Sequence, residues 1–285
     1  MSAPPFAYFG GKTSLAAAIV NLLPDHGHYV EPYAGSLAVL LAKPPSAMET
    51  VNDLDANLMT FWRVLRDRPD ELIRACALTP HSRAEHQAAL ADRGGCADLE
   101  RARRVWVTLT QGRGGVPVRS GWRHYVRPVG GTGLPAYLSG YVDRLAAAAE
   151  RLARVSLECR PALELIARYG QAPDVLLYVD PPYLGATRSG CDGLRGGTRR
   201  YQHELLGDGE HRELLGVLLG CRAAVVLSGY PSALYDELLT GWDRAEFASG
   251  TGQSARGEWS QRTEVLWSNR PLGQQPGLFD GEAAS

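Results

Sequence analysis

A run of five apolar residues, Val175 to Val179, restricts the fold of this chain more than any other feature. Its length suits a strand, and the lack of polar alternation indicates that both faces of the strand are buried. A strand covered on both faces is typical of a parallel sheet with a layer of helices on each side. We therefore expect an α/β fold in which this run is a central strand.

The N-terminal part of the chain repeats this pattern. Residues Tyr29–Glu31 and Thr50–Asp53 have the composition of strands, and helical spacing follows in Ser36–Ala42 and in Leu54–Arg66. Alternating strands and helices predict parallel strands of one sheet. Beyond residue 133, besides the apolar run, we expect a long helix and three strands, namely Ala136–Arg154, Val155–Glu158, Ala223–Leu227 and Glu264–Trp267.

Residues 69–133 differ from the preceding segment in their pattern of expected secondary structure. Helical pieces without a strong strand are expected at Glu71–Leu78, Ser82–Ala91 and Leu99–Thr110, and a stretch rich in Gly and Arg follows, Gln111–Arg127. We interpret residues 69–133 as an insertion into a discontinuous main domain of residues 1–68 and 134–269. Residues 270–285 are rich in Gly, Pro and Gln, so we expect a flexible tail there.

Charge and cysteine composition exclude several classes of protein. Lys plus Arg is 30 and Asp plus Glu is 31, so any nucleic-acid binding needs a local basic face rather than bulk charge. The five cysteines include no CxxC pair, so neither a disulfide framework nor a metal site is expected. The chain shows no secretory signal and no apolar run of membrane-spanning length, so we expect a cytoplasmic protein without a membrane partner.

The most specific motif is Asp180-Pro181-Pro182-Tyr183, directly after the apolar run. Ligands of open α/β sheets bind beyond the C-terminal ends of the strands. The two prolines stiffen the turn and remove two backbone donors, while their carbonyls still accept hydrogen bonds. Asp180 and the Pro181 carbonyl can therefore accept the exocyclic amine of a planar base, and Tyr183 can stack on its ring. The weaker interpretation is a rigid loop with a capping Asp.

Two further motifs are predicted to lie at the same edge of the sheet. Glu31-Pro32-Tyr33-Ala34-Gly35-Ser36 forms a strand-to-helix turn in which Gly35 permits close approach of a ligand. Asp53 lies 22 residues after Glu31, at the end of the next strand. Nucleotide-binding sheets hold ribose hydroxyls with an acidic residue at about this spacing. The alternative for Asp53 is a cap for the helix that begins at Leu54.

The N-terminal Tyr8-Phe9-Gly10-Gly11-Lys12-Thr13 ends like a phosphate-binding P-loop. A P-loop requires a glycine five residues before Gly11, and Phe6 occupies that position. No strong strand precedes the segment either. The spacing therefore excludes a P-loop.

Taken together, these motifs resemble the Dam-like family of DNA adenine-N6 methyltransferases. The motifs extend over nearly the whole chain and follow the same order as in that family: Gly-Gly-Lys, the Glu-Pro-aromatic turn, the acidic residue, a helical insertion, then Asp-Pro-Pro-Tyr. This is the family's α arrangement. It implies a Rossmann-like S-adenosylmethionine-dependent methyltransferase sheet, with residues 69–133 as the target-recognition region.

The resemblance also implies a role for each motif in binding S-adenosylmethionine. Lys12 would bind the methionine carboxylate, Asp53 the ribose, and Asp180 would lie close to the methionine part. The cofactor-binding residues implied are Tyr8, Gly10, Gly11, Lys12, Glu31, Tyr33, Gly35, Asp53 and Asp180. The sequence departs from the family at Leu37, where the family often has a second glycine.

The implied reaction is methyl transfer to N6 of an adenine flipped out of duplex DNA. The catalytic residues implied are Asp180, Pro181, Pro182 and Tyr183, which align the amine without a cysteine nucleophile or a metal. One alternative is a cytosine-N4 methyltransferase, in which Ser often replaces the leading Asp. Another is a catalytically silent DNA-binding relative, which would not need Lys12, Asp53 and Asp180 together.

Double-stranded DNA is the partner implied, and arginines are its expected contacts: Arg113, Arg119, Arg123, Arg127 and Arg199. The first four lie in the Gly-rich part of the insertion, interleaved with Trp122 and Tyr125, which suits contacts to phosphates and bases. A solvated arginine-rich loop explains any single one of them nearly as well. Whether the enzyme has an endonuclease partner stays open.

The tail carries one further short motif. Gln275, Leu278 and Phe279 resemble the peptide that bacterial sliding clamps bind, with a polar pocket for Gln and an apolar pocket for Leu-Phe. The alternative, which we favour, is that Leu278 and Phe279 fold back onto the domain. We expect a nucleoid-associated protein that is a monomer in solution.

Overall fold

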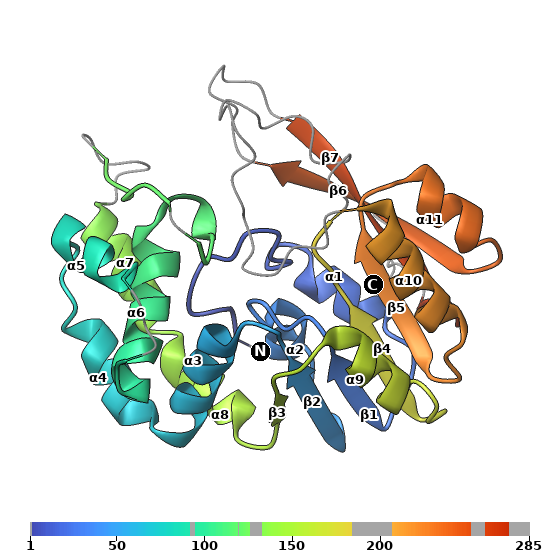
Figure 1. Ribbon diagram of the computed structural model, residues 1–285, viewed down its shortest axis with the longest axis horizontal. Helices are drawn as coiled ribbons and strands as arrows, with labels where there is room; N and C mark the ends of the chain where they lie inside the picture. The colour runs from blue at the N-terminus through green and yellow to red at the C-terminus, as the bar shows by residue number, and fades with distance from the viewer. Residues whose placement is uncertain are drawn as a thin grey trace, which may run out of the picture.

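The structure is a computed structural model that describes residues 2–91, 95–118, 120–125, 133–183, 207–251 and 260–273. A seven-stranded sheet forms its centre, in the order β3-β2-β1-β4-β5-β7-β6 (Figure 1). The strands are β1 (His28–Glu31), β2 (Met48–Asn52), β3 (Ser156–Glu158), β4 (Val175–Val179), β5 (Ala224–Gly229), β6 (Asp243–Thr251) and β7 (Ser260–Ser268). Strand β7 is antiparallel to β5 and β6, and the remaining pairs are parallel. The predicted α/β, Rossmann-like fold is thus confirmed.

The apolar run is the central strand β4, as predicted, and it pairs with β1 and β5. Its side chains alternate between two hydrophobic cores, with Leu176 and Tyr178 in one and Val175, Leu177 and Val179 in the other. Both faces of the strand are therefore covered. The edge strand β6 is absent from the sequence prediction, because its residues are largely polar and do not alternate regularly.

Helices cover both faces of the sheet (Figure 1). Helices α1, α2, α3, α6 and α8 contribute to the core on one face, and α9, α10 and α11 to the core on the other. The helices are α1 (Ala16–Leu22), α2 (Ala38–Ala42), α3 (Ala56–Asp67), α4 (Pro69–Ala77), α5 (Arg83–Ala89), α6 (Asp98–Gln111), α7 (Leu134–Val142), α8 (Leu145–Leu152), α9 (Ala162–Tyr169), α10 (Asp208–Leu219) and α11 (Ala233–Leu238), with a 3-10 turn at Arg113–Gly115.

The prediction of one long helix over Ala136–Arg154 is wrong, because α7 ends before Asp143 and α8 begins after Arg144. At this break the Arg144 N–H donates to the Tyr141 carbonyl at 3.3 Å, three residues back rather than four. The Arg144 guanidinium donates to the Pro4 carbonyl at 3.2 Å. Apolar residues on both sides of the break continue the helical pattern, so the sequence hides it.

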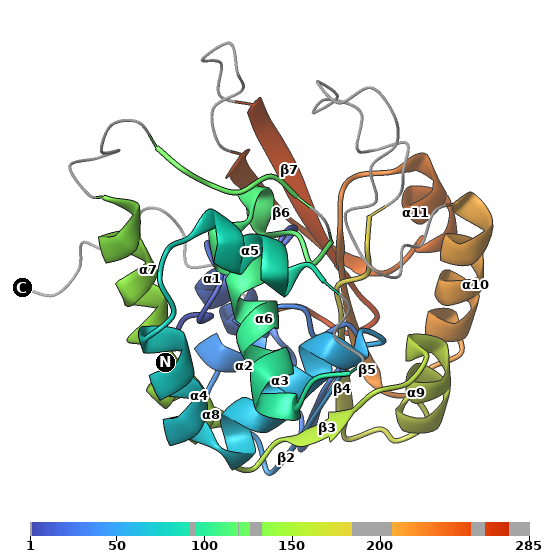
Figure 2. The same ribbon diagram turned by 60° about the vertical axis from the view of Figure 1, so that its left-hand side comes forward.

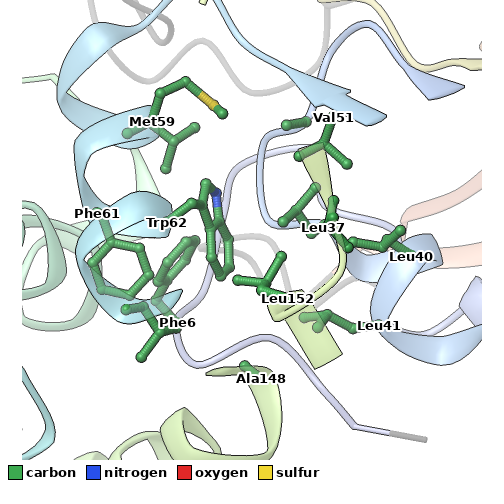
Figure 3. Close-up of a cluster of buried hydrophobic side chains, with 14 of the residues drawn as sticks. Phe6, Leu37, Leu40, Leu41, Val51, Met59, Phe61, Trp62, Ala148 and Leu152 are labelled. Atoms are coloured by element: carbon green, nitrogen blue, oxygen red, sulfur yellow. The ribbon is translucent and has the colours of Figure 1, made fainter. Parts of the chain in front are cut away.

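Helices α4 and α6 lie beside α3, α4 also lies beside α8, and α5 lies beside α6 (Figure 2). Their buried apolar side chains belong to the same core as those of α3 and α8. Trp106 on α6 is 1% exposed and belongs to the same cluster as Trp62 on α3 and Leu152 on α8. Its indole N–H donates to the Pro5 carbonyl at 3.0 Å. Figure 3 shows Trp62 beside Phe6, within this cluster. Helices α4, α5 and α6 are thus held against the rest of the structure by apolar packing.

A buried ionic cluster lies at the start of β2. Lys43 Nζ lies 2.7 Å from Glu49 Oε1, and two nitrogens of Arg151 also contact the Glu49 carboxylate. Only 3% of the Glu49 side chain and 4% of the Lys43 side chain are exposed. One carboxylate therefore contacts two cations, and it links the C-terminal end of α2 to β2 and α8.

Candidate active site

A cavity of about 430 Å³ lies where β1, β2 and β4 end. Parallel strands end at a common edge, so the loops that follow them converge there. The cavity wall contains every residue that the sequence singled out for cofactor and base binding, in the segments Tyr8–Lys12, Glu31–Ser36, Asp53–Asp55 and Asp180–Tyr183. Other wall residues are Ala38, Val39, Pro161–Leu163, Tyr178 and Glu210.

The turn after β1 is tied to the end of β2 through Asp53. The Gly35 N–H donates to Asp53 Oδ2 at 3.1 Å, and the Asp55 N–H donates to Asp53 Oδ1 at 2.9 Å. The cap of α3 is Asp55, whose side chain accepts the N–H groups of Asn57 and Leu58. Asp53 is thus not the helix cap; it lies at the cavity and connects two of its loops.

Gly35 has a left-handed backbone with φ +46°. A Cβ at this position would lie 3.1 Å from Cε1 of Tyr8, so any larger residue would press on the tyrosine ring. Leu37, two residues on, is the only non-glycine residue with positive φ in the described segments, at φ 55° and ψ 30°. The departure from the family at this position therefore falls on a backbone conformation that favours glycine.

The Lys12 ammonium joins the N-terminal segment to the loop after β4, 168 residues further along the chain. Its Nζ donates to Asp180 Oδ1 at 2.7 Å, to Asp180 Oδ2 at 2.8 Å and to the Gly10 carbonyl at 3.1 Å. It also contacts the Tyr183 hydroxyl. Only 4% of the Lys12 side chain is exposed, so the ion pair is well shielded from solvent.

Burial shifts the protonation of both central groups. It raises the pKa of Asp180 to about 6; Lys12 opposes this shift and the Glu264 carboxylate adds to it. Burial alone would lower the pKa of Lys12, but the charges of Asp180 and Glu264 outweigh it and raise that pKa. At neutral pH the pair is therefore an ammonium and a largely ionised carboxylate.

Glu31 is 2% exposed and faces inward. Its Oε1 accepts the Tyr29 hydroxyl at 2.5 Å and the Leu40 N–H at 3.0 Å. Burial raises the pKa of Glu31 to about 8, so it carries a proton at neutral pH. Burial and the Asp53 charge also raise the pKa of Tyr33.

Sequence reasoning missed two residues that contact Tyr183. The ring of Tyr230 lies 4.3 Å from the Tyr183 ring, tilted by 46°. Tyr230 follows β5, so the rule that led to Asp180 could have found it. Glu264 on β7 accepts the Tyr183 hydroxyl at 2.9 Å. The signal for Glu264 was an acidic residue directly before the apolar Val265-Leu266-Trp267.

The described part of the Gly-rich stretch forms an aromatic and basic cluster. The Trp122 ring stacks between His81 and His124, with ring centres 4.6 and 5.3 Å away. The Arg83 guanidinium lies 4.7 Å from the centre of the Trp122 ring. Neither His81 nor Arg83 belonged to the predicted DNA contacts.

Of those contacts, Arg113 is exposed, and the Arg123 guanidinium lies 4.6 Å from the Tyr137 ring centre and 6.0 Å from that of Tyr125. The other three predicted DNA contacts, Arg119, Arg127 and Arg199, fall outside the described residues, as do Gln275, Leu278 and Phe279 of the predicted clamp motif.

The same stretch contacts the N-terminal segment. The Phe9 N–H donates to the Gly115 carbonyl at 2.8 Å. Gly115 has φ +60°, and a Cβ there would lie 2.7 Å from the Ala7 carbonyl oxygen. The approach is therefore close enough to require glycine.

Neither a metal-binding group nor a membrane-spanning helix is present in the described residues. In those segments, no group of three or more His, Cys, Asp and Glu side chains is arranged to hold a metal ion. No helix of the described chain has the length and apolar character needed to cross a membrane.

Comparison with known proteins gave two matches in sequence. Residues 8–90 match the model of the D12 class N6 adenine-specific DNA methyltransferases. This range contains the first three cavity segments. The chain is also 26% identical over 284 residues to the Type II methyltransferase M1.LlaDCHI of Lactococcus lactis subsp. cremoris, covering 93% of this chain and 95% of that protein.

Similar solved structures include the precorrin 8W decarboxylase of Methanobacterium thermoautotrophicum, with 10% identity, a TM-score of 0.38, and coverage of 94% of this chain and 98% of that one. The C-terminal domain of precorrin-6Y C5,15-methyltransferase from Rhodobacter capsulatus has 11% identity, a TM-score of 0.34, and coverage of 95% of this chain and 100% of that one. TM-scores this low do not establish a shared fold.

Proposed function

We propose that the cavity binds S-adenosylmethionine and an adenine flipped out of the DNA duplex. The chain belongs to the Dam-like family of N6-adenine-specific DNA methyltransferases. The protein is a DNA methyltransferase, and DNA is its substrate. The observation that carries the finer proposal is the convergence of Lys12, Asp53 and Asp180 on one cavity, from three distant parts of the sequence.

The cavity wall fits S-adenosylmethionine. Its volume of about 430 Å³ suits a small-molecule ligand. Gly35 leaves the backbone open to a ligand, half-buried Asp53 offers a carboxylate to ribose hydroxyls, and Lys12 offers a cation to the methionine carboxylate. We assign the cofactor to Tyr8, Gly10, Gly11, Lys12, Glu31, Tyr33, Gly35, Asp53 and Asp180. When bound, S-adenosylmethionine supplies an electrophilic methyl group.

The loop after β4 provides the acceptors for the target amine. Asp180 is ionised at neutral pH because its pKa is about 6, so it accepts one N–H of the amine, and the Pro181 carbonyl accepts the other. These two bonds hold the nitrogen lone pair toward the methyl donor. Tyr183 stacks on the base, and Pro182 stiffens the turn. Catalysis then comes from alignment and electrostatics.

The identity of the base follows from the leading residue of the loop. An Asp at position 180 favours adenine N6 over cytosine N4, where Ser is often found instead. A catalytically silent relative is disfavoured, since pure DNA binding would not need Lys12 and Asp180 as a shielded ion pair.

For DNA, we propose contacts through the aromatic and basic cluster and the arginines around it. Trp122 and its stacked neighbours His124 and Arg83 offer a flat, basic surface. Such surfaces contact phosphates and bases. The arginines assigned to DNA remain Arg113, Arg119, Arg123, Arg127 and Arg199.

The test is methyl transfer from labelled S-adenosylmethionine to unmethylated DNA, followed by mass spectrometry of the nucleosides. We expect N6-methyladenine from the wild-type protein and none from Asp180→Ala. Asp174→Ala, at an exposed residue directly before β4, is the matched control and should be fully active. N4-methylcytosine would show that the base is misassigned, and an active Asp180→Ala protein would refute the site.

The C-terminal motif supports a separate proposal, a contact with a sliding clamp by Gln275, Leu278 and Phe279 in a nucleoid-associated monomer. A peptide of residues 274–285 should bind a bacterial clamp, and the peptide with Leu278→Ala and Phe279→Ala should not. Equal binding of both peptides, or of neither, contradicts this contact.

A further inference from the structure

Glu264 is an acidic residue in an apolar strand. It lies on β7, directly before Val265, Leu266 and Trp267, and is 3% exposed. Burying a carboxylate is costly unless charges and hydrogen bonds compensate. Its neighbours therefore indicate why it is there.

Its contacts run to the loop after β4, to the adjacent strand β5 and to Lys12 in the N-terminal segment. Its Oε1 accepts the Tyr183 hydroxyl at 2.9 Å and the Ser228 hydroxyl of β5 at 2.7 Å. Lys12 Nζ lies 3.5 Å from the same oxygen. Glu264 itself is not among the residues that line the cavity, whereas Lys12 and Tyr183 are. Any effect on the reaction must therefore pass through those two side chains.

We propose that Glu264 is a positioning residue for methyl transfer, which holds the Tyr183 ring in place through the tyrosine hydroxyl. This inference rests on the proposed function, in which Tyr183 stacks on the target base. The Tyr183 hydroxyl donates to Glu264 and also contacts Lys12 Nζ, and Tyr230 packs against the ring at 4.3 Å. The stacking surface is thus set before the base arrives, which lowers the cost of ordering it.

Glu264 affects methyl transfer through its hydrogen bond with the Tyr183 hydroxyl, and not through the charge on Lys12. Lys12 already has the Asp180 carboxylate at 2.7 Å, nearer than Glu264 at 3.5 Å. The Tyr183 hydroxyl lies 2.9 Å from Glu264 and 3.4 Å from Asp180. Glu264 is thus the nearer carboxylate acceptor for the hydroxyl and the farther one for the ammonium.

Four single variants and one double variant test this. Glu264→Met removes the acceptor at similar volume, and Tyr183→Phe removes the donor but keeps the ring. Glu264→Gln keeps an acceptor oxygen and removes the charge. Glu246→Gln is the matched control, because Glu246 is an exposed residue on the neighbouring strand β6, paired with Val265. Thermal unfolding checks that each variant is folded.

We expect kcat for methyl transfer to fall about 5- to 10-fold in both Glu264→Met and Tyr183→Phe, the effect of one lost hydrogen bond. The Glu264→Met/Tyr183→Phe double variant should fall no further than either alone. Glu264→Gln should keep kcat within about 2-fold of wild type, and S-adenosylmethionine affinity should stay unchanged in all variants.

Additive losses in the double variant would overturn the proposal, as would a Glu264→Gln protein as impaired as Glu264→Met. Wild-type kcat in Tyr183→Phe would also overturn it, even if the Glu264→Met protein does not fold. Failure of the proposed function is distinguishable, because it would appear as an active Asp180→Ala protein.

Discussion

Leu37 combines a strained backbone conformation, which lowers stability, with a buried side chain, which raises it. Substitutions at this position separate the two contributions to the free energy of unfolding. Leu37 has φ 55° and ψ 30°, a left-handed conformation that costs a non-glycine residue roughly 1 kcal/mol. Its side chain is 1% exposed and packs in the cluster of Figure 3. Leu37→Ala should lower the free energy of unfolding by about 3 kcal/mol, the usual cost of emptying a buried leucine site. Leu37→Gly also releases the strain, so its cost should be only about 2 kcal/mol.

Leu41 is the matched control, since it is a fully buried leucine of α2 in the same cluster, with negative φ. There a glycine should cost about 1 kcal/mol more than an alanine, because it loses backbone entropy in a helix. The order of stability of the glycine and alanine variants should therefore reverse between positions 37 and 41.

Urea denaturation of the four variants, followed by circular dichroism, measures the four free energies of unfolding. Glycine less stable than alanine at both positions would refute the argument, because strain at position 37 would then contribute nothing.

Methyl transfer should decline below about pH 6, because Asp180, whose pKa burial raises to about 6, then carries a proton and loses its acceptor role; a pH profile of kcat checks this. Lys12→Ala and Asp53→Ala should weaken binding of S-adenosylmethionine more than binding of DNA, and calorimetry showing unchanged cofactor affinity in both would contradict the assignment. Glu49→Ala should lower the free energy of unfolding by about 3–5 kcal/mol, because Lys43 and Arg151 lose their shared buried partner. Burial alone would raise the pKa of Glu49, but Arg151 and Lys43 lower it, so this stability is present at neutral pH and is lost as acid protonates the carboxylate. Arg119→Ala, Arg123→Ala and Arg127→Ala should each weaken DNA binding or relax sequence choice without changing cofactor affinity, and three variants that methylate the same sites at wild-type rate would place recognition elsewhere.

The sheet and the cavity were predictable because their signals are local. An apolar run of five residues such as Val175–Val179 predicts a strand covered on both faces, and the residues after it are then expected at one edge of the sheet. The same reasoning placed Glu31 and Asp53 at that edge without knowledge of any contact.

Contacts between distant segments were not predictable in the same way. The choice of Glu264 as partner of Tyr183 depends on β7 running antiparallel beside β5, which no local pattern specifies. At the break between α7 and α8, the Arg144 guanidinium donates to the Pro4 carbonyl, which lies 140 residues away. In both cases the contact joins residues that are far apart in the sequence.

The bond from the Phe9 N–H to the Gly115 carbonyl limits how the segment 69–133, proposed as an insertion, can be exchanged between relatives. In a chimera that exchanges only residues 69–133, a loop from the relative would lie against the native Ala7 carbonyl. Any residue larger than glycine at position 115 would then collide with that carbonyl. It would also give the Pro5 carbonyl a new partner in place of Trp106. The unit that can be transplanted is therefore the insertion together with the first nine residues of the chain.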